Sequence, residues 1–128
     1  MIKEKHDNVF YVHGGTDVGD REAIRGIVEK SEGAIIVASL GTFSTGISIK
    51  KIHNIFFTES FKSEVIIRQS IGRGLRLKDN DSDATLYDIA DDLTHNEKEN
   101  YTLSHFRERI NIYNEEDFEY EIHNVELK

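Results

Sequence analysis

Residues 34–38 restrict the possible folds of this chain more than any other segment, because all five of them (AIIVA) are apolar. A strand with one face in water alternates apolar and polar residues, whereas a strand that is covered on both faces is apolar throughout. Strands of the second kind occur in parallel sheets that have helices on both faces. Residues 34–38 therefore predict a buried strand in the parallel sheet of an α/β fold.

The rest of the chain alternates between segments typical of strands and segments typical of helices. The other predicted strands are residues 8–12, 52–57, 84–90 and 118–125. The predicted helices run from Arg21, after a cap at Asp20, to Lys30; from Ser63 through residues 69–76; and from Thr94, in a capping box with Glu97, to about Asn114. This alternation predicts a three-layer fold, in which a parallel sheet has flanking helices and right-handed crossovers.

The composition limits the class of protein. A length of 128 residues without an internal repeat or a linker is typical of one domain. The absence of cysteine excludes a disulfide framework and fits a cytoplasmic protein. No apolar run approaches the length of a membrane span, and the first eight residues lack the apolar core of a secretion signal. We therefore expect a single cytoplasmic domain that does not contact a membrane.

The charge of the chain is unevenly distributed. The formal net charge is −8, which argues against a protein that coats nucleic acid generally. Between Ser44 and Lys78, however, seven basic residues stand against two acidic ones, so this window carries +5 and the remainder carries −13. A basic window in an acidic protein indicates one anion-facing surface.

The titratable residues do not have the spacing of a metal site. Six histidines are scattered through the chain, and none has a partner at the spacing of metal ligands. Asp91 and Asp92 follow the predicted strand 84–90 as a pair of carboxylates, but no third ligand is spaced to join them. We expect a helix cap or a solvated loop at this pair, and no metal held by this chain.

A run of small polar residues follows the buried strand. Residues 39–48 (SLGTFSTGIS) combine hydroxyl side chains with two glycines. In open α/β sheets, ligands bind at the carboxyl ends of the strands, and hydroxyl groups with free backbone N–H groups suit phosphate. An ordinary strand-to-helix loop also favours Ser, Thr and Gly. Both interpretations remain open on local grounds.

Two arginines end the predicted helix after Ser63. Arg73 and Arg76 lie three residues apart in the run from Gln69 to Arg76, next to Gly72. On a helix they would share one face, and two guanidinium groups beside a glycine suit a phosphate or a developing phosphoryl charge. The alternative is a solvated helix end, where basic residues favour the negative end of the dipole.

Three segments in this order resemble the second RecA-like domain of superfamily 2 helicases and translocases. Residues 69–76 (QSIGRGLR) are similar to motif VI, whose pattern is Gln-x-x-Gly-Arg-x-x-Arg, and residues 39–48 are similar to motif V. His13 and Gly14, with Arg21, are similar to the His-Gly segment that precedes motif V. The resemblance spans residues 8–125. The run GTFSTGIS and the Asp pair after strand 84–90 are similar to the DNA helicases of T-even-type phages.

The resemblance implies a role for each motif. ATP would bind between two RecA-like domains, the first of which supplies the P-loop and the Mg²⁺ ligands. Arg76 would be the catalytic arginine finger and Arg73 its partner. The resemblance places the nucleotide contacts of this chain at Gln69, Gly72, Arg73, Arg76, Gly46 and Ser48. Ser48 stands where many members have an Asp that contacts the nucleotide sugar, so a sugar contact is in doubt at that position.

The resemblance also implies a nucleic-acid partner. It places contacts to the phosphodiester backbone at His13, Gly14, Ser39, Thr42, Ser44 and Thr45. Phosphate contacts carry no sequence information, so recognition would depend on DNA structure, with branched or duplex DNA expected.

Two motifs of the family are missing from the chain. There is no Gly-x-x-x-x-Gly-Lys-Ser/Thr segment and no Asp-Glu box. The family's second domain normally begins with one more strand and helix, and residues 1–6 resemble the end of that helix. We therefore expect a helicase C-terminal domain without its first strand and without the first RecA-like domain, which would not hydrolyse ATP alone.

Two alternatives remain from the sequence. One is another superfamily 2 translocase, such as the motor of a restriction enzyme or a repair helicase. The other is a non-catalytic α/β interaction domain, which the net charge of −8 and the missing P-loop would fit.

Overall fold

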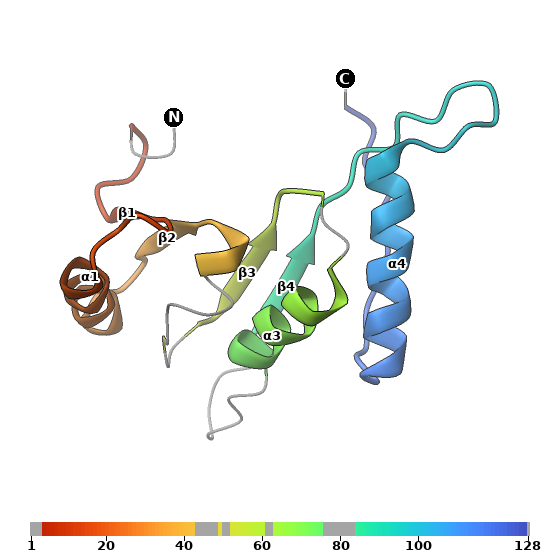
Figure 1. The fold of residues 1–128 in the computed structure, drawn as a ribbon. Helices are drawn as coiled ribbons and strands as arrows, with labels where there is room; N and C mark the ends of the chain where they lie inside the picture. The colour runs from red at the N-terminus through yellow and green to blue at the C-terminus, as the bar shows by residue number, and fades with distance from the viewer. Residues whose placement is uncertain (1–3, 43–48, 50–51, 61–62, 76–83, 128) are drawn as a thin grey trace. The chain divides into compact units, whose positions relative to one another are not determined.

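The computed structural model describes residues 4–42, 49, 52–60, 63–75 and 84–127. Its elements in chain order are β1 (Val9–Val12), α1 (Val18–Lys30), β2 (Ile35–Ala38), β3 (Asn54–Phe57), α3 (Glu64–Leu75), β4 (Thr85–Asp88) and α4 (Tyr101–Glu115) (Figure 1). Apart from β2 and β3, which follow each other in this order, strands alternate with helices, and the parallel strands with flanking helices confirm the predicted α/β class. Within the described ranges, no helix has both the length and the apolar character needed to cross a bilayer.

The chain divides into two compact units. The first comprises Met1–Phe56 with Val65–Tyr87, and the second comprises Phe57–Glu64 with Asp88–Lys128.

In the first unit, β1 and β2 form a parallel pair. Val9 lies opposite Ile35, and Val12 lies opposite Ala38. Val12 is 1% exposed and forms a small core with Ile49, against which partly buried side chains of α1, β2 and the segment before β3 pack; these are Ile24, Val28, Ile36, Ala38 and Ile52. Helix α1 therefore covers one face of the pair.

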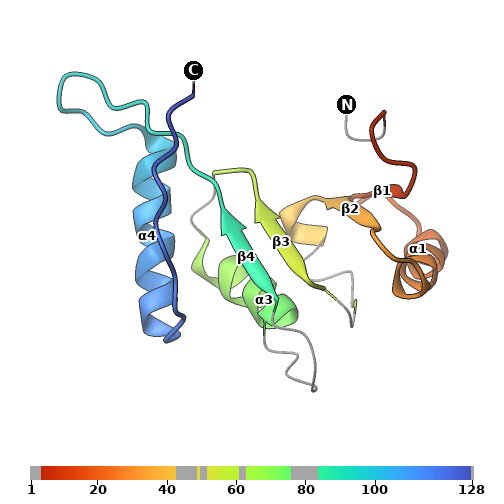
Figure 2. The ribbon, with the colours of Figure 1, turned by 180° about the vertical axis from the view of Figure 1, so that it is seen from behind.

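The first unit also contains most of a second parallel pair, β3 and β4. The N–H of Thr85 donates to His53 O (2.9 Å), and the N–H of Ile89 donates to Phe57 O (3.0 Å). Both strands advance by four residues in the same direction between these bonds, so the pair is parallel, as the arrows in Figure 2 show. Helix α3 lies over one face of the pair (Figures 1 and 2), and Ile55 of β3 is buried. Phe56 and Tyr87 stack on the exposed face, with ring centroids 4.6 Å apart.

In the second unit, a buried ion pair joins α4 to Asp88. Asp88 accepts from Arg109 Nε (2.8 Å) and Nη2 (2.7 Å), and from the Tyr113 hydroxyl (2.6 Å). The Arg109 side chain is fully buried, and both ends of its planar fork are matched by carboxylate oxygens. The charge of Arg109 is therefore neutralised in place.

Helix α1 starts earlier than predicted. It begins at Val18 with Asp17 as its N-cap, whose side chain accepts from the N–H of Gly19 at 2.7 Å. Asp20, the predicted cap, lies in the first turn instead, where a negative charge favours the helix dipole.

Helix α4 starts later than predicted. Thr94 and Glu97 do not form a capping box, because Thr94 donates to Asp92, and His95 pairs with Lys98 across a tight turn. Asn96 (φ 49°) and Glu97 (φ 62°) are both left-handed, as in the turns of β-hairpins. The helix begins only after Asn100.

The predicted strand 118–125 is also wrong. Residues 118–127 belong to neither of the two strand pairs. After Asp117 (φ 59°), the chain turns back and runs beside α4 in both ribbon views (Figures 1 and 2). The Tyr120 hydroxyl donates to Asn114 Oδ1 at 3.0 Å, which ties this tail to α4.

Candidate functional site

The loops after β1 and β2 meet at one end of the parallel pair. Val12 and Ala38 are opposite each other, so His13 and Ser39 each follow a strand end at the same edge. The N–H of Ser39 continues the ladder by donating to Val12 O at 3.3 Å. Three residues predicted to contact nucleic acid, His13, Gly14 and Ser39, thus come together at the carboxyl edge, where α/β sheets bind ligands.

Ser39 and Thr42 form a pair of hydroxyl groups at this edge. Their oxygens lie 2.7 Å apart, and either group can donate. Ser39 is exposed and directly precedes the helical residues 40–42, whereas Thr42 is 6% exposed. The Ser39 hydroxyl can therefore reach a ligand, and the Thr42 hydroxyl orients it from within.

The His13 ring is held by its own loop. Its Nδ1 accepts from the N–H of Gly15 at 3.0 Å, so the neutral ring carries its proton on Nε2. The main chain of His13 is also fixed, because its N–H donates to Thr16 Oγ1 and its carbonyl accepts from the N–H of Thr16, both at 3.0 Å. Nε2–H is therefore an oriented donor on an exposed ring.

Arg21 of α1 is hydrogen-bonded to the main chain of the same loop. Its Nε donates to Thr16 O (2.9 Å), and its Nη2 donates to Gly14 O (3.0 Å) and His13 O (3.3 Å). The sequence placed Arg21 in the His-Gly segment without indicating its role. The structure shows a guanidinium group that fixes main-chain carbonyls.

The loop after β1 and the helical residues after β2 both leave space beside a glycine. A side chain added at Gly14 or at Gly41 would meet no heavy atom within 4 Å. Open space beside a glycine lets another molecule approach the main chain closely.

Helix α3 carries the described part of the predicted nucleotide contacts. Ile67 is fully buried, and Gln69 is exposed. Arg73 follows Gln69 by four residues within α3, so the two positions share the face opposite Ile67. Gly72 also lies in this helix. Arg76 lies outside the described residues, as do Ser44, Thr45, Gly46 and Ser48.

The sequence analysis missed the cluster of Asp88, Arg109 and Tyr113. Burial, followed by the charge of Asp88, raises the pKa of Tyr113 above that of a free tyrosine. One sequence signal was available: Arg109 lies three residues after Phe106 and four before Tyr113, within the apolar stripe of α4. An arginine in such a stripe needs a buried partner, and Asp88 ends the preceding strand.

The Asp91–Asp92 pair forms a loop, as predicted. Asp92 Oδ1 accepts from Thr94 Oγ1 (2.6 Å) and from the Thr94 N–H (3.0 Å), which lowers the pKa of Asp92. Among the described residues, no group of three or more His, Asp or Glu side chains is arranged to hold a metal ion.

Comparison with known proteins gives both a sequence match and a structural match. The chain is 38% identical over 137 aligned residues, which include 99% of its length, to the C-terminal part of the ATP-dependent DNA helicase UvsW of Enterobacteria phage T4. The chain resembles the C-terminal domain of a superfamily 2 helicase. It spans 27% of UvsW. No family model matches the chain.

The structural match agrees with the sequence match. The crystal structure of the C-terminal part of the Fun30 ATPase domain superposes with a TM-score of 0.59, at 16% identity, over 90% of this chain and 43% of that one. This likeness establishes the fold, that of a C-terminal RecA-like ATPase domain with parallel strands and flanking helices.

Proposed function

We propose that this chain is the C-terminal motor domain of an ATP-dependent DNA helicase or branch-remodelling translocase that acts in repair, recombination or replication restart. The observation that carries the proposal is the 38% identity to a DNA helicase over 99% of the chain. The meeting of His13, Gly14 and Ser39 at one sheet edge supports it, because these are residues that the motifs assign to nucleic acid.

The DNA contact in this proposal is made to phosphates. His13 Nε2–H is an oriented donor, the exposed Ser39 hydroxyl can donate when it accepts from Thr42, and Gly14 has open space beside it. Hydrogen bonds to phosphate fix the position of a protein on DNA without reading its sequence. We therefore expect the domain to distinguish DNA structures, with Thr42, Ser44 and Thr45 completing the site.

The ATP contact in this proposal is shared with an N-terminal RecA-like domain. ATP supplies the phosphoryl group that is transferred to water. Gln69 is exposed on α3, and the same helix contains Gly72 and Arg73; we assign these residues, together with Arg76, Gly46 and Ser48, to the rim of a shared site. The arginines would stabilise the negative charge that develops on the phosphoryl oxygens. We assign the Mg²⁺ ligands to the N-terminal domain.

Replacement of the proposed finger tests this function. In the protein that contains both RecA-like domains, Arg76→Ala should lower the rate of ATP hydrolysis by about 10³- to 10⁵-fold. DNA affinity should stay unchanged, because Arg76 would face the nucleotide. Steady-state phosphate release and fluorescence anisotropy with forked DNA measure the two effects.

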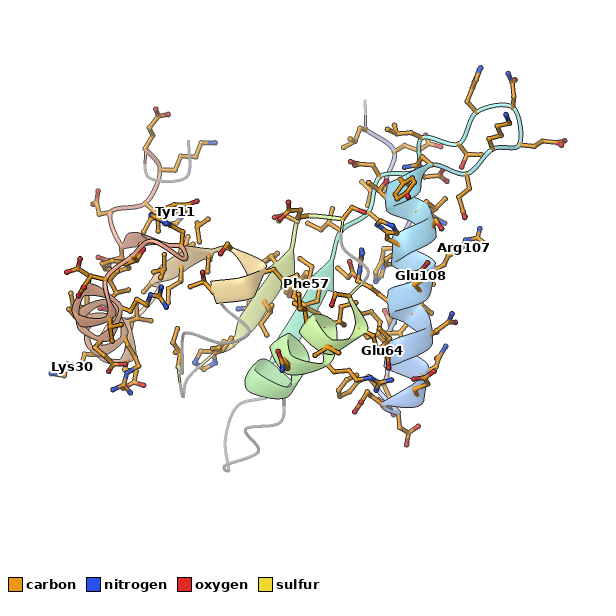
Figure 3. All side chains as sticks on the ribbon, in the orientation of Figure 1. Tyr11, Lys30, Phe57, Glu64, Arg107 and Glu108 are labelled. Atoms are coloured by element: carbon orange, nitrogen blue, oxygen red, sulfur yellow. The ribbon has the colours of Figure 1, made fainter. Side chains whose placement is uncertain are left out.

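Arg107→Ala is a matched control. Arg107 projects from α4 (Figure 3), is largely exposed and pairs with Glu99 at 2.6 Å, so its removal should leave hydrolysis unchanged. Hydrolysis at the wild-type rate by the Arg76→Ala protein would show that the finger lies elsewhere.

A further inference from the structure

Tyr11 is an exposed aromatic residue beside the candidate DNA site. Its neighbour Val12 is 1% exposed and packs toward α1, whereas Tyr11 is 65% exposed. Successive side chains of a strand point to opposite faces, so the Tyr11 ring lies on the face of β1 away from α1 (Figure 3). Among the described residues, burial in the core therefore does not account for this ring.

Tyr11 and His13 together present two rings on the same side. They are two residues apart along an extended segment, and their ring centroids lie 5.4 Å apart at an angle of 38°. The His13 ring is fixed by the hydrogen bond from Gly15, and its loop is fixed by Arg21. The two rings thus form one aromatic surface, in which hydrogen bonds fix the His13 ring and its loop.

The position of this surface selects its ligand. It leads directly into the edge where His13 Nε2–H and the Ser39 hydroxyl can take a phosphate. A nucleotide held there by its phosphate has its base within reach of the neighbouring rings.

We propose that Tyr11 and His13 form a stacking surface for an unpaired nucleobase of single-stranded DNA. The proposal rests on the proposed function and adds the kind of DNA that the site prefers. A base inside a duplex is already stacked and paired, so only an unpaired base can lie on the two rings. The surface would make the domain favour single strands and the open arms of branched DNA.

Binding of three DNA probes to the full 128-residue chain tests the proposal. The probes are a single-stranded oligonucleotide, the same strand with abasic sugars, and a blunt duplex. Tyr11→Ala should weaken binding to the single strand by about tenfold and leave the other two unchanged. This loss should be the same at low and high salt, because phosphate contacts carry the salt dependence. Tyr11→Phe should bind as wild type.

Tyr101→Ala is the matched control. Tyr101 is 76% exposed, and its ring centroid lies 4.8 Å from that of a histidine, His105. Tyr101 lies on α4 in the second unit. Its removal should change no affinity. Thermal unfolding of each variant shows whether the fold is kept.

The contrary outcomes separate the two proposals. Wild-type affinity of Tyr11→Ala for the single strand would overturn the stacking surface and leave the proposed function standing. An equal loss on all three probes would also overturn it, because it would show a general effect on the loop. Failure of the wild-type chain to bind any probe would overturn both the stacking surface and the proposed DNA contact.

Discussion

Arg21 donates its three observed hydrogen bonds to main-chain carbonyl oxygens. The acceptors are His13, Gly14 and Thr16, all in the loop after β1. These bonds use its Nε–H and both N–H groups of Nη2, so the observed contacts of Arg21 hold the loop. Arg21 therefore differs in role from the arginines proposed for the nucleotide, although all of them lie in helicase-like motifs.

Replacement of Arg21 by lysine should loosen the loop. A single ammonium group cannot reproduce the planar fork that spans three carbonyls. We expect the free energy of unfolding to fall by about 1–2 kcal/mol, and DNA affinity to fall with it, because the position of His13 depends on the loop. Urea unfolding and anisotropy measure the two.

Arg25→Lys is the control for Arg21→Lys. Arg25 lies on the same helix and pairs with the side chains of Glu22 and Glu29. Ion pairs between partly exposed side chains on one helix contribute little to stability, and lysine keeps the charge. If both substitutions had equal effects, the role assigned to Arg21 would be wrong.

At the scale of elements, the apolar pattern predicted the strands better than the helix starts. Asp17 and Asp20 are both good caps three residues apart, and only the backbone decides between them. Thr94 and Glu97 have capping-box spacing, but the hairpin turn at Asn96 and Glu97 takes precedence. When a sequence pattern fits two different helix starts, the pattern alone does not determine which start forms.

The tail shows a different limit of prediction. Residues 118–125 alternate apolar and polar residues, as a half-buried strand does. Alternation indicates which side chains share a face, but a strand also needs a partner for its hydrogen bonds. In the described part of the chain, the tail lies beside α4 and joins no sheet. The sequence contains no information on that choice.

The hydrogen bond from Tyr113 of α4 to Asp88 should be lost at alkaline pH. The pKa of Tyr113 is raised by burial and then by the charge of Asp88, so the folded chain keeps a proton that the unfolded chain loses above about pH 10. Its contribution to stability is full below that pH. Above it, the free energy of unfolding should fall by about 1.4 kcal/mol per pH unit more than in Tyr113→Phe.

Urea unfolding between pH 8 and pH 11 checks this prediction. At pH 8, Tyr113→Phe should be less stable than wild type by about 1–3 kcal/mol, because Asp88 loses one donor. Tyr120→Phe is the control, since Tyr120 is partly exposed and bonds only to an amide oxygen in the described structure. An identical alkaline slope in wild type and Tyr113→Phe would contradict the assignment.

At the scale of the whole molecule, the sequence predicted which residues belong to the site better than it predicted the tertiary contacts that position them. Motif order and strand pattern placed His13 and Ser39 at strand ends, and the parallel register brings them together. The difference in exposure between Ser39 and Thr42, and the pairing of Asp88 with Arg109 across 21 residues, depend on tertiary packing. No periodicity in the sequence encodes such contacts.

The whole 128-residue chain should not turn over ATP by itself. The chain contains no P-loop segment, so the nucleotide site proposed here needs residues from another domain. Phosphate release should stay at the level of a protein-free control, with or without DNA. Addition of a separately prepared N-terminal RecA-like domain should restore turnover. Clear turnover by the chain alone would contradict a shared site.

The way Arg21 holds its loop also bears on how this segment can vary among related chains. The carbonyl oxygens that it fixes are present in every amino acid, so the hold of Arg21 on the loop does not depend on which side chains stand at positions 13 and 14, whereas the Thr16 hydroxyl is a second hold that does depend on its side chain. The path of the loop and the chemistry of the side chain at position 13 can then change independently in evolution. A lineage that retained Arg21 could exchange His13 for another donor, and so acquire a new preference for DNA structure without rebuilding the strand end.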